Sequence, residues 1–260
     1  MTSKNLVILI NEEDISLISL NDKESFNALS IDLLNELFDA LKEADNDKST
    51  KTIILKGLGR GFSAGHNLKE IQENQDEIYY RNLLTCSKNV MTVLSNLNKP
   101  VIAEVHGVAT AAGCQLVAAC DLAYADTNTR FATPGVNIGI FCHTPLVAVS
   151  RTIAKKHSME MLLLGDLIGA DEAKRFGLIN DIFEPSELHK EVMNIAKRIS
   201  SKSSYVIGLG KKTFYTQLNM DLEDAYEYAT ERMIKNLKAD DAAEGIKAFV
   251  DKRDPKWKDS

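Results

Sequence analysis

The chain has 260 residues, of which 44% are hydrophobic and 26% charged, and its formal net charge is -6. This length and composition fit one large domain with a sizeable core, and the negative charge argues against nucleic acid or an anionic membrane as partners. Four cysteines without a C-x-x-C pair fit neither a zinc site nor a disulfide framework. No apolar run reaches the roughly 18 residues of a membrane span, and the start lacks a signal sequence, so we expect a cytoplasmic protein. The alternative is an organellar protein whose transit peptide is missing from this sequence.

Predicted strands alternate with predicted helices along the first part of the chain. In chain order they are two strands joined by an acidic turn (5–10 and 15–20), a helix (30–44), a buried strand (52–57), a helix (76–97) and two strands (101–107 and 122–126). Leucines at helical spacing indicate the first helix, for which Ser30 is a suitable N-cap.

The second part of the chain is mainly helical. Residues 169–183 predict a short helix that ends at Gly177 and then a strand. From Pro185 onward the pattern is almost entirely helical. Strand–helix alternation followed by helices predicts an α/β core with a helical C-terminal extension.

A glycine-rich loop, "GLGRGF", follows the strand at 52–57. A dinucleotide-binding fingerprint needs a third glycine where this chain has Phe62, and the chain has no phosphate-binding G-x-x-x-x-G-K-[ST] motif. The loop therefore does not indicate a nucleotide cofactor.

Two runs of small residues, "FSAGHNLKE" (62–70) and "TAAGCQL" (110–116), each follow a strand and precede an expected helix. Amides in the first turn of a helix have no partner within it, so two such turns could converge into an oxyanion hole. Small residues are also what tight helix–strand packing selects. The residue pattern by itself leaves both interpretations open.

These two stretches, in this order, resemble the crotonase superfamily, also called the enoyl-CoA hydratase/isomerase family. Further family-like segments are "SFNALS", "CDLAYADTNTRFATPGVNIGI", "SMEMLLLGDLIGADEAKRFGLIND" and "DAAEGIKAFVDKRDPKW". The resemblance therefore covers nearly the whole chain. The forms "FSAGHNLKE" and "ATAAGCQL" most resemble a divergent subgroup, the domain-containing protein 3 type of enoyl-CoA hydratase relatives.

The resemblance implies an α/β fold, a crotonase-like spiral of ββα units with a helical C-terminal extension. Residues 1–190 would form the core with the acyl-CoA site, and residues 191–260 would serve trimerisation and close the CoA site. The expected assembly is a homotrimer or a dimer of trimers. Coenzyme A would enter as part of the substrate, with no tightly bound cofactor and no metal.

Carried over by motif, the backbone amides of His66 and Ala112 would form the oxyanion hole that stabilises a thioester enolate. The side chain of His66 would be packed or exposed, and the alternative is that it has a chemical role of its own. The residues expected to contact CoA are Ser25, Phe26, Ala64, Gly65, Asn67, Leu68 and Lys69.

Gln115 and Gly135 stand where a typical hydratase of this family has its two glutamates. An amide cannot exchange a proton at accessible pH, although it can hold a water or a carbonyl group. Gly135 would offer only space. We therefore expect ordinary hydration to be weak.

A substitute acid or base could come from His143, which precedes Thr144-Pro145, a suitable N-cap and first helical residue. A helix N-terminus would lower the imidazole pKa, and the diene-isomerising branch of the family has an acidic residue near this position. The alternative is a histidine that merely lies in a loop, and Cys142 fits a buried apolar position better than a nucleophile. The expected function is acyl-CoA thioester processing, and the alternative is a catalytically silent acyl-CoA-binding or regulatory homologue.

Overall fold

The computed structural model describes residues 5–260. The strands are β1 (Val7–Glu12), β2 (Ile15–Leu20), β3 (Thr52–Gly57), β4 (Val101–Val105), β5 (Val108–Thr110), β6 (Leu122–Asp126), β7 (Arg130–Ala132), β8 (Ile168–Gly169) and β9 (Asp181–Phe183). The helices are α1 (Ile31–Asn46), α2 (Leu68–Glu73), α3 (Glu77–Asn96), α4 (Ala112–Ala119), α5 (Pro145–Thr152), α6 (Lys155–Leu164), α7 (Ala170–Phe176), α8 (Leu188–Ser200), α9 (Ser204–Gln217), α10 (Leu222–Leu237) and α11 (Asp240–Asp251), with short 3₁₀ helices η1 (Lys23–Ser25) and η2 (Pro134–Ile138).

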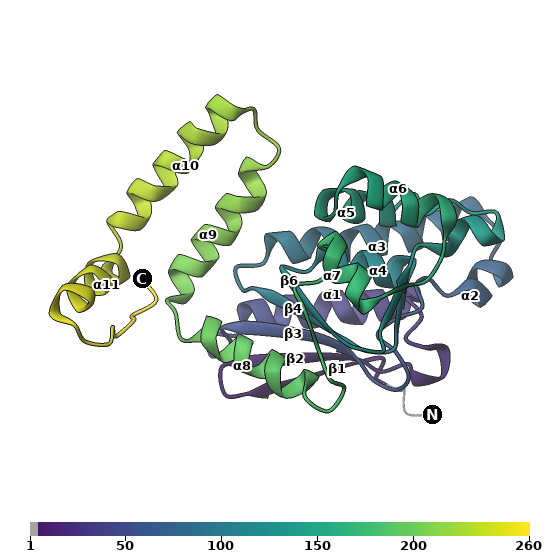
Figure 1. Cartoon of the computed structure of the whole chain (residues 1–260), viewed down its shortest axis with the longest axis horizontal. Helices are drawn as coiled ribbons and strands as arrows, with labels where there is room; N and C mark the ends of the chain where they lie inside the picture. The colour runs from purple at the N-terminus through teal and green to yellow at the C-terminus, as the bar shows by residue number, and fades with distance from the viewer. Residues whose placement is uncertain (1–4) are drawn as a thin grey trace.

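The main sheet has the strand order β1-β2-β3-β4-β6-β9 (Figure 1). β1 and β2 form the predicted antiparallel hairpin, and the other neighbouring strands pair in parallel. A smaller sheet has the order β5-β7-β8. The chain passes from β4 through β5 into α4, and from β6 through β7 into η2, so strand–strand–helix units follow one another. The crotonase-type α/β spiral expected from the sequence is confirmed.

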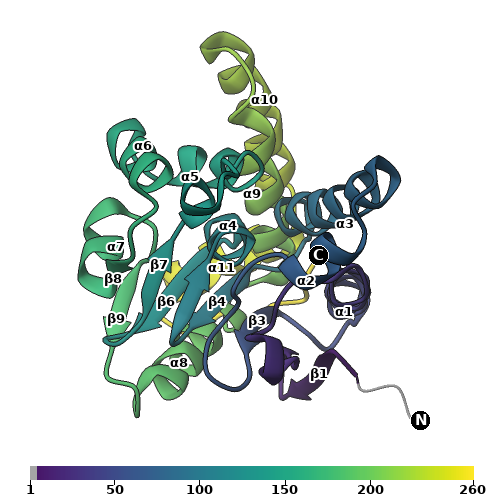
Figure 2. The ribbon, with the colours of Figure 1, turned by 90° about the vertical axis from the view of Figure 1, so that its right-hand side faces the viewer.

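Strand β2 presents buried apolar side chains to both faces of the main sheet, with the buried Ser16 and Ser19 between them. Ile18 and Leu20 pack into the cluster that α1 and α3 cover, whereas Ile15 and Leu17 pack against α8. A mainly parallel sheet covered on both faces requires such apolar runs. Figure 2 shows α8 on the face of the sheet opposite α1 and α3.

Helix α1 forms where the leucine spacing predicts it. Ser30 accepts a hydrogen bond from the Leu33 amide at 3.1 Å, which confirms the expected N-cap. Leu33, Leu37 and Leu41 are fully buried. Burial of each such side chain contributes about 1.5–3 kcal/mol, so the amphipathic pattern both fixes the helix and docks it on the sheet.

The C-terminal helices divide into one that covers the sheet and three that project from it. Leu188, Val192 and Ala196 of α8 pack on the sheet, and the predicted boundary at residues 190 and 191 falls within this helix. Helices α9, α10 and α11 form an arm that extends away from the sheet (Figure 1). No residue of α10 is buried.

Residues 257–260 run back along α11 toward its start. The Asp241 carboxylate, 1% exposed, accepts hydrogen bonds from the Lys258 amide at 2.7 Å and the Asp259 amide at 2.9 Å. Burial by itself would raise the pKa of Asp241, but these bonds and one from the Ser203 hydroxyl lower it. The buried charge therefore fastens the final residues to the start of α11.

Candidate functional site

The two small-residue stretches lie in direct contact. A side-chain carbon on Gly65, whose φ is +92°, would lie 3.1 Å from the Ala112 nitrogen and 2.8 Å from the Ala111 Cβ. A side-chain carbon on Gly113 would lie 2.3 Å from the Ser63 carbonyl oxygen. Larger residues would push the two segments apart, so close packing is one reason for the small residues in both stretches.

The contact is reinforced by backbone hydrogen bonds. The Ser63 amide donates to the Val108 carbonyl at 3.1 Å, and the Thr110 amide donates to the Ser63 carbonyl at 3.0 Å. At Ala111 the chain turns from β5 into α4 with φ 49° and ψ -119°. Such a conformation is costly for a residue with a Cβ, and conformations of this kind cluster at functional sites.

Within residues 5–260, the amides of His66 and Ala112 have no hydrogen-bond acceptor. Ala112 is the first residue of α4, so its amide lacks a partner within the helix. His66 forms a parallel bridge with Leu29, in which the Gly65 carbonyl accepts from the Leu29 amide at 2.7 Å and the Leu29 carbonyl from the Asn67 amide at 3.4 Å. In that pattern the His66 amide faces away from Leu29. Two free donors therefore lie on adjoining segments.

The stretch that holds His66 precedes a helix as expected, but His66 itself lies before the first turn of that helix. Helix α2 starts at Leu68, and Asn67 caps it, accepting hydrogen bonds from the amides of Lys69 at 3.1 Å and Glu70 at 3.4 Å. The Asn67 side chain therefore accepts from amides in the first turn of α2, and it leaves the His66 amide without an acceptor. The His66 amide is free because of its place beside Leu29, and not because of a helix end.

Among residues 5–260, the buried polar side-chain atoms without a hydrogen-bond partner include His66 Nε2, Gln115 Oε1 and Thr133 Oγ1. Burial lowers the pKa of His66 to about 4, so its ring is neutral at pH 7. A buried unpaired polar group costs about 1–3 kcal/mol, so such groups point to a ligand or water. Thr133 was not among the sequence candidates, because a threonine beside Pro134 carries no signal of its burial.

The structure changes the interpretation of Gly135. Gln115, 5% exposed, lies on α4 as expected. A side-chain carbon on Gly135, however, would lie 2.2 Å from the Ile140 carbonyl oxygen and 3.0 Å from the Cys142 Sγ. The prediction that Gly135 leaves open space is wrong, because the backbone of the following turn already fills it. A glutamate could enter here only if that turn moved.

His143 and Cys142 differ sharply in exposure. His143 is exposed, and its ring centre lies 5.3 Å from that of Phe141. Cys142 is buried, and burial raises the pKa of its thiol, which disfavours the reactive thiolate. Pro145 starts α5 as expected, but Thr144 does not cap it. Its backbone is already helical, whereas a capping residue needs an extended one.

The residues expected to contact CoA lie partly together. The Ala64 amide donates to the Phe26 carbonyl at 3.0 Å, which joins the segment of Ser25 and Phe26 to that of Ala64 and Gly65. The remaining expected residues are Asn67, engaged in capping α2, and the exposed Leu68 and Lys69.

A cation that the sequence did not single out also lies at this segment. The Arg60 guanidinium lies 4.0 Å above the Phe26 ring. Arg60 could have been noticed as the only charged residue of "GLGRGF". Over the part of the chain that the structure describes, no group of three or more His, Cys, Asp or Glu side chains is placed to hold a metal, and no helix is long and apolar enough to cross a membrane.

Comparisons with known proteins agree on one family. The family model described as enoyl-CoA hydratase/isomerase matches residues 11–260. The mitochondrial enoyl-CoA hydratase domain-containing protein 3 of Xenopus laevis is 44% identical over 97% of this chain and 86% of its own length. The human protein of that name is 47% identical over 92% of this chain and 79% of its own. A crystal structure of an enoyl-CoA hydratase from Mycobacterium smegmatis has a TM-score of 0.95 at 40% identity and covers 98% of this chain and 99% of its own.

The names of the vertebrate relatives contradict the expected cytoplasmic location. The relatives from Xenopus laevis, mouse and human are all named as mitochondrial. The cytoplasmic prediction from composition and from the first residues is therefore wrong by this comparison. Neither composition nor free cysteines distinguish the cytosol from another reducing compartment.

Proposed function

Because this chain belongs to the enoyl-CoA hydratase/isomerase family, and resembles its domain-containing protein 3 type, we propose that it processes acyl-CoA thioesters through an enolate. In this proposal the thioester oxygen binds between the amides of His66 and Ala112. The observation that carries the proposal is that both amides lack an acceptor on segments held together by Gly65 and Gly113.

The oxyanion hole would supply the main catalytic effect. Charge develops on the thioester oxygen when the α-proton leaves, and two preorganised amides stabilise it more strongly than they stabilise the neutral carbonyl. Loss of one such donor commonly costs about 10²–10³ in rate. Because Gly65 and Gly113 allow the segments to approach, the substrate carbonyl could meet backbone rather than side chains.

The acid/base step would differ from that of a two-glutamate hydratase. Gln115 can position a water or carbonyl but cannot exchange protons, and Gly135 has no room for a carboxylate. His143 is our candidate for the proton-transferring group. Its exposure in the chain described here means that a substrate or another subunit must cover it before it works in a dry site.

For binding, we propose that the segments of Ser25–Phe26 and Ala64–Lys69 contact CoA, which enters as part of the substrate. The assembly we propose is a homotrimer or a dimer of trimers. Apolar side chains exposed on the projecting arm support an assembly, and those more than half exposed are Phe214, Leu218, Leu222, Tyr226, Met233, Leu237, Ile246, Phe249 and Val250. Large exposed apolar patches mark interaction sites, and these side chains lie on the helices and the connection of the same projecting arm.

A second candidate function is acyl-CoA binding without turnover. It is favoured by the absence of any carboxylate at positions 115 and 135 and by the filled space beside Gly135. Such a protein would keep the oxyanion hole and lose the proton transfer. The two functions predict the same binding and differ only in chemistry.

The test is exchange of the α-protons of acyl-CoA thioesters in D₂O, followed by mass spectrometry, with parallel calorimetry using acetoacetyl-CoA, an enolate mimic. We expect acetoacetyl-CoA to bind and the α-protons to exchange. Binding without exchange would favour the silent homologue. No binding at millimolar acetoacetyl-CoA would contradict the assignment of the site.

A further inference from the structure

Two buried polar side chains close to the proposed oxyanion hole are not used by the fold. Gln115 is 5% exposed, and Thr133 is fully buried. Within residues 5–260, neither Gln115 Oε1 nor Thr133 Oγ1 has a hydrogen-bond partner. Burial of a polar atom without a partner costs stability, and such an atom in a folded chain therefore points to a ligand that pairs with it.

Other buried hydroxyl groups of this region hydrogen-bond to the backbone. The Thr129 hydroxyl donates to the Val105 carbonyl at 3.1 Å, and the Ser63 hydroxyl donates to the Asn27 carbonyl at 2.8 Å. Thr133 directly precedes η2, but its side chain does not cap that helix. The Thr133 hydroxyl is therefore left free where comparable hydroxyl groups serve the fold.

Gln115 and Thr133 are both held close to the turn at Ala111 that leads into α4. The Gln115 amide donates to the Ala111 carbonyl at 3.0 Å, and the Ala111 amide donates to the carbonyl of Ala132, the neighbour of Thr133, at 2.9 Å. Helical side chains lean toward the N-terminus of their helix, and residues three apart share a face. The Gln115 side chain therefore leans toward the turn that begins at Ala112, whose amide is proposed to hold the thioester oxygen.

The unpaired groups are uncharged, and together they can both accept and donate a hydrogen bond. Gln115 Oε1 only accepts, whereas the Thr133 hydroxyl can also donate. The His66 ring, whose Nε2 is likewise buried and unpaired, is neutral at pH 7 because burial lowers its pKa to about 4. A ligand hydroxyl can donate to Gln115 and accept from Thr133, but a keto oxygen cannot donate and an alkyl chain can do neither. A carboxylate would find no cation among these three groups.

We propose that Gln115 and Thr133 form a hydroxyl-binding pair, which selects acyl-CoA thioesters whose acyl chain carries a hydroxyl group close to the thioester. This inference rests on the acyl-CoA function proposed above and names the acyl group that the site prefers. Thr133 is then a specificity-determining residue. A site built to pair with a substrate hydroxyl discriminates against the analogue that lacks it, because the buried groups of the site then stay unpaired.

The test is calorimetric titration of the full chain with butyryl-CoA and, separately, with 2-hydroxybutyryl-CoA and with each enantiomer of 3-hydroxybutyryl-CoA. We expect one hydroxylated thioester to bind at least about tenfold more tightly than butyryl-CoA. Thr133→Val removes the hydroxyl with little change of shape and should lower this preference about fivefold, and Gln115→Met/Thr133→Val should abolish it. Because the Thr133 hydroxyl has no partner among residues 5–260, Thr133→Val should keep or raise the midpoint of unfolding.

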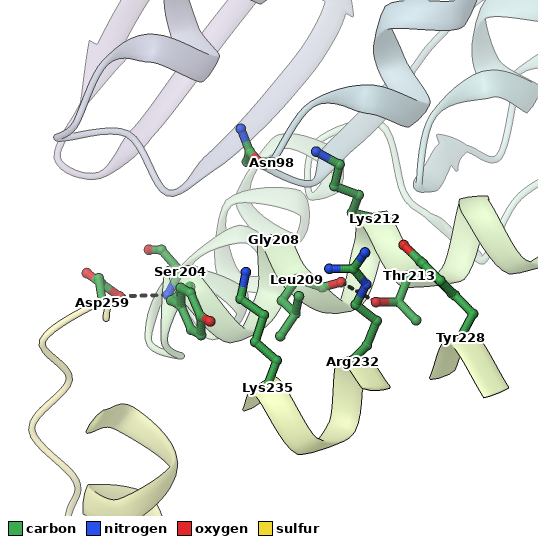
Figure 3. Close-up of a pocket in the computed structure, with 11 residues that line it drawn as sticks. Asn98, Ser204, Gly208, Leu209, Lys212, Thr213, Tyr228, Arg232, Lys235 and Asp259 are labelled. Carbon is green, nitrogen blue, oxygen red and sulfur yellow. Dashed lines mark hydrogen bonds between the residues drawn. The ribbon is translucent and has the colours of Figure 1, made fainter. Parts of the chain in front are cut away.

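Thr213→Val is the matched control, because it makes the same substitution on the projecting arm. The Thr213 hydroxyl donates to the Leu209 carbonyl of its own helix, α9, at 2.7 Å (Figure 3). This variant should keep the preference of the wild type for the hydroxylated thioester.

Equal binding of butyryl-CoA and all the hydroxylated thioesters to the wild type overturns this inference and leaves the proposed acyl-CoA site intact. A preference that persists in the double variant overturns it as well. If Thr133→Val weakens every thioester alike and lowers the midpoint of unfolding, Thr133 has a structural role and is not a specificity determinant. If no thioester binds to the wild type, the proposed function fails and this inference fails with it.

Discussion

Burial of the His66 ring gives the protein a pH dependence that the structure makes quantitative. Burial lowers the pKa of His66 from 6.5 to about 4. The unfolded chain takes up a proton here as the pH falls through 6.5, whereas the folded chain resists until about pH 4. Between these two pH values the unfolded state binds more protons than the folded state. The free energy of unfolding therefore falls as the pH falls through this range, and above pH 6.5 the His66 ring no longer lowers it.

The size of the effect follows from the same values. At about 1.4 kcal/mol per pH unit, lowering the pH from about 7.5 to about 4.5 removes about 2.5 kcal/mol of the free energy of unfolding through His66. His66→Gln keeps a polar side chain but cannot titrate. Urea unfolding at fixed protein concentration should therefore show that the wild type loses about 2.5 kcal/mol more than this variant over that range.

His143→Gln is the matched control, because it removes an exposed imidazole. The additional loss of stability that distinguishes the wild type from His66→Gln should persist when His143 is replaced. If His66→Gln and the wild type lose stability in parallel, the His66 ring is accessible to water in the folded chain, and the explanation by burial is refuted.

Further expected outcomes concern the proposed site. Gly135→Ala places a carbon 2.2 Å from the Ile140 carbonyl oxygen and should lower the free energy of unfolding by about 1–3 kcal/mol; calorimetric unfolding with an unchanged midpoint would contradict the packing argument. Gln115→Glu by itself should raise crotonyl-CoA hydration by about 10²-fold, measured by loss of the conjugated thioester absorbance, and no change would mean that Gln115 does not face the substrate. His143→Gln should abolish α-proton exchange while acyl-CoA affinity is retained. If exchange persists in this variant, His143 is not the proton-transferring group. Ala112→Pro removes an amide donor and should weaken both binding and exchange, and normal values for both would exclude Ala112 from the oxyanion hole.

The long elements of the fold could be predicted because each carries its own signal. The leucines of α1 repeat at helical spacing, and the strands of the main sheet are apolar runs bounded by turns. The second sheet could not be predicted in the same way. Its strands, such as β5 (Val108–Thr110) and β7 (Arg130–Ala132), are too short to show alternation and exist because they pair with each other.

The site was predictable where it depends on residue size and not where it depends on neighbours. The small residues Gly65 and Gly113 stand out in the sequence, and they lie where the segments 62–70 and 110–116 contact each other. The collision beside Gly135 comes from Ile140, which has no periodic relation to it. The buried hydroxyl of Thr133 and the position of Arg60 over Phe26 likewise follow from tertiary contacts.

The contact of Gly65 and Gly113 with the opposite segment has a consequence for variation among proteins of this fold. The frame that brings the two amides together consists of backbone and of positions without a side chain. Side chains at 115, 133 and 143 are not part of that frame, so they can be exchanged while its geometry persists. Lineages can therefore replace one proton-transfer chemistry by another through a few substitutions, whereas the two glycines admit almost none. A combinatorial library at 115, 133 and 143 is accordingly the place to select new reactions from this scaffold.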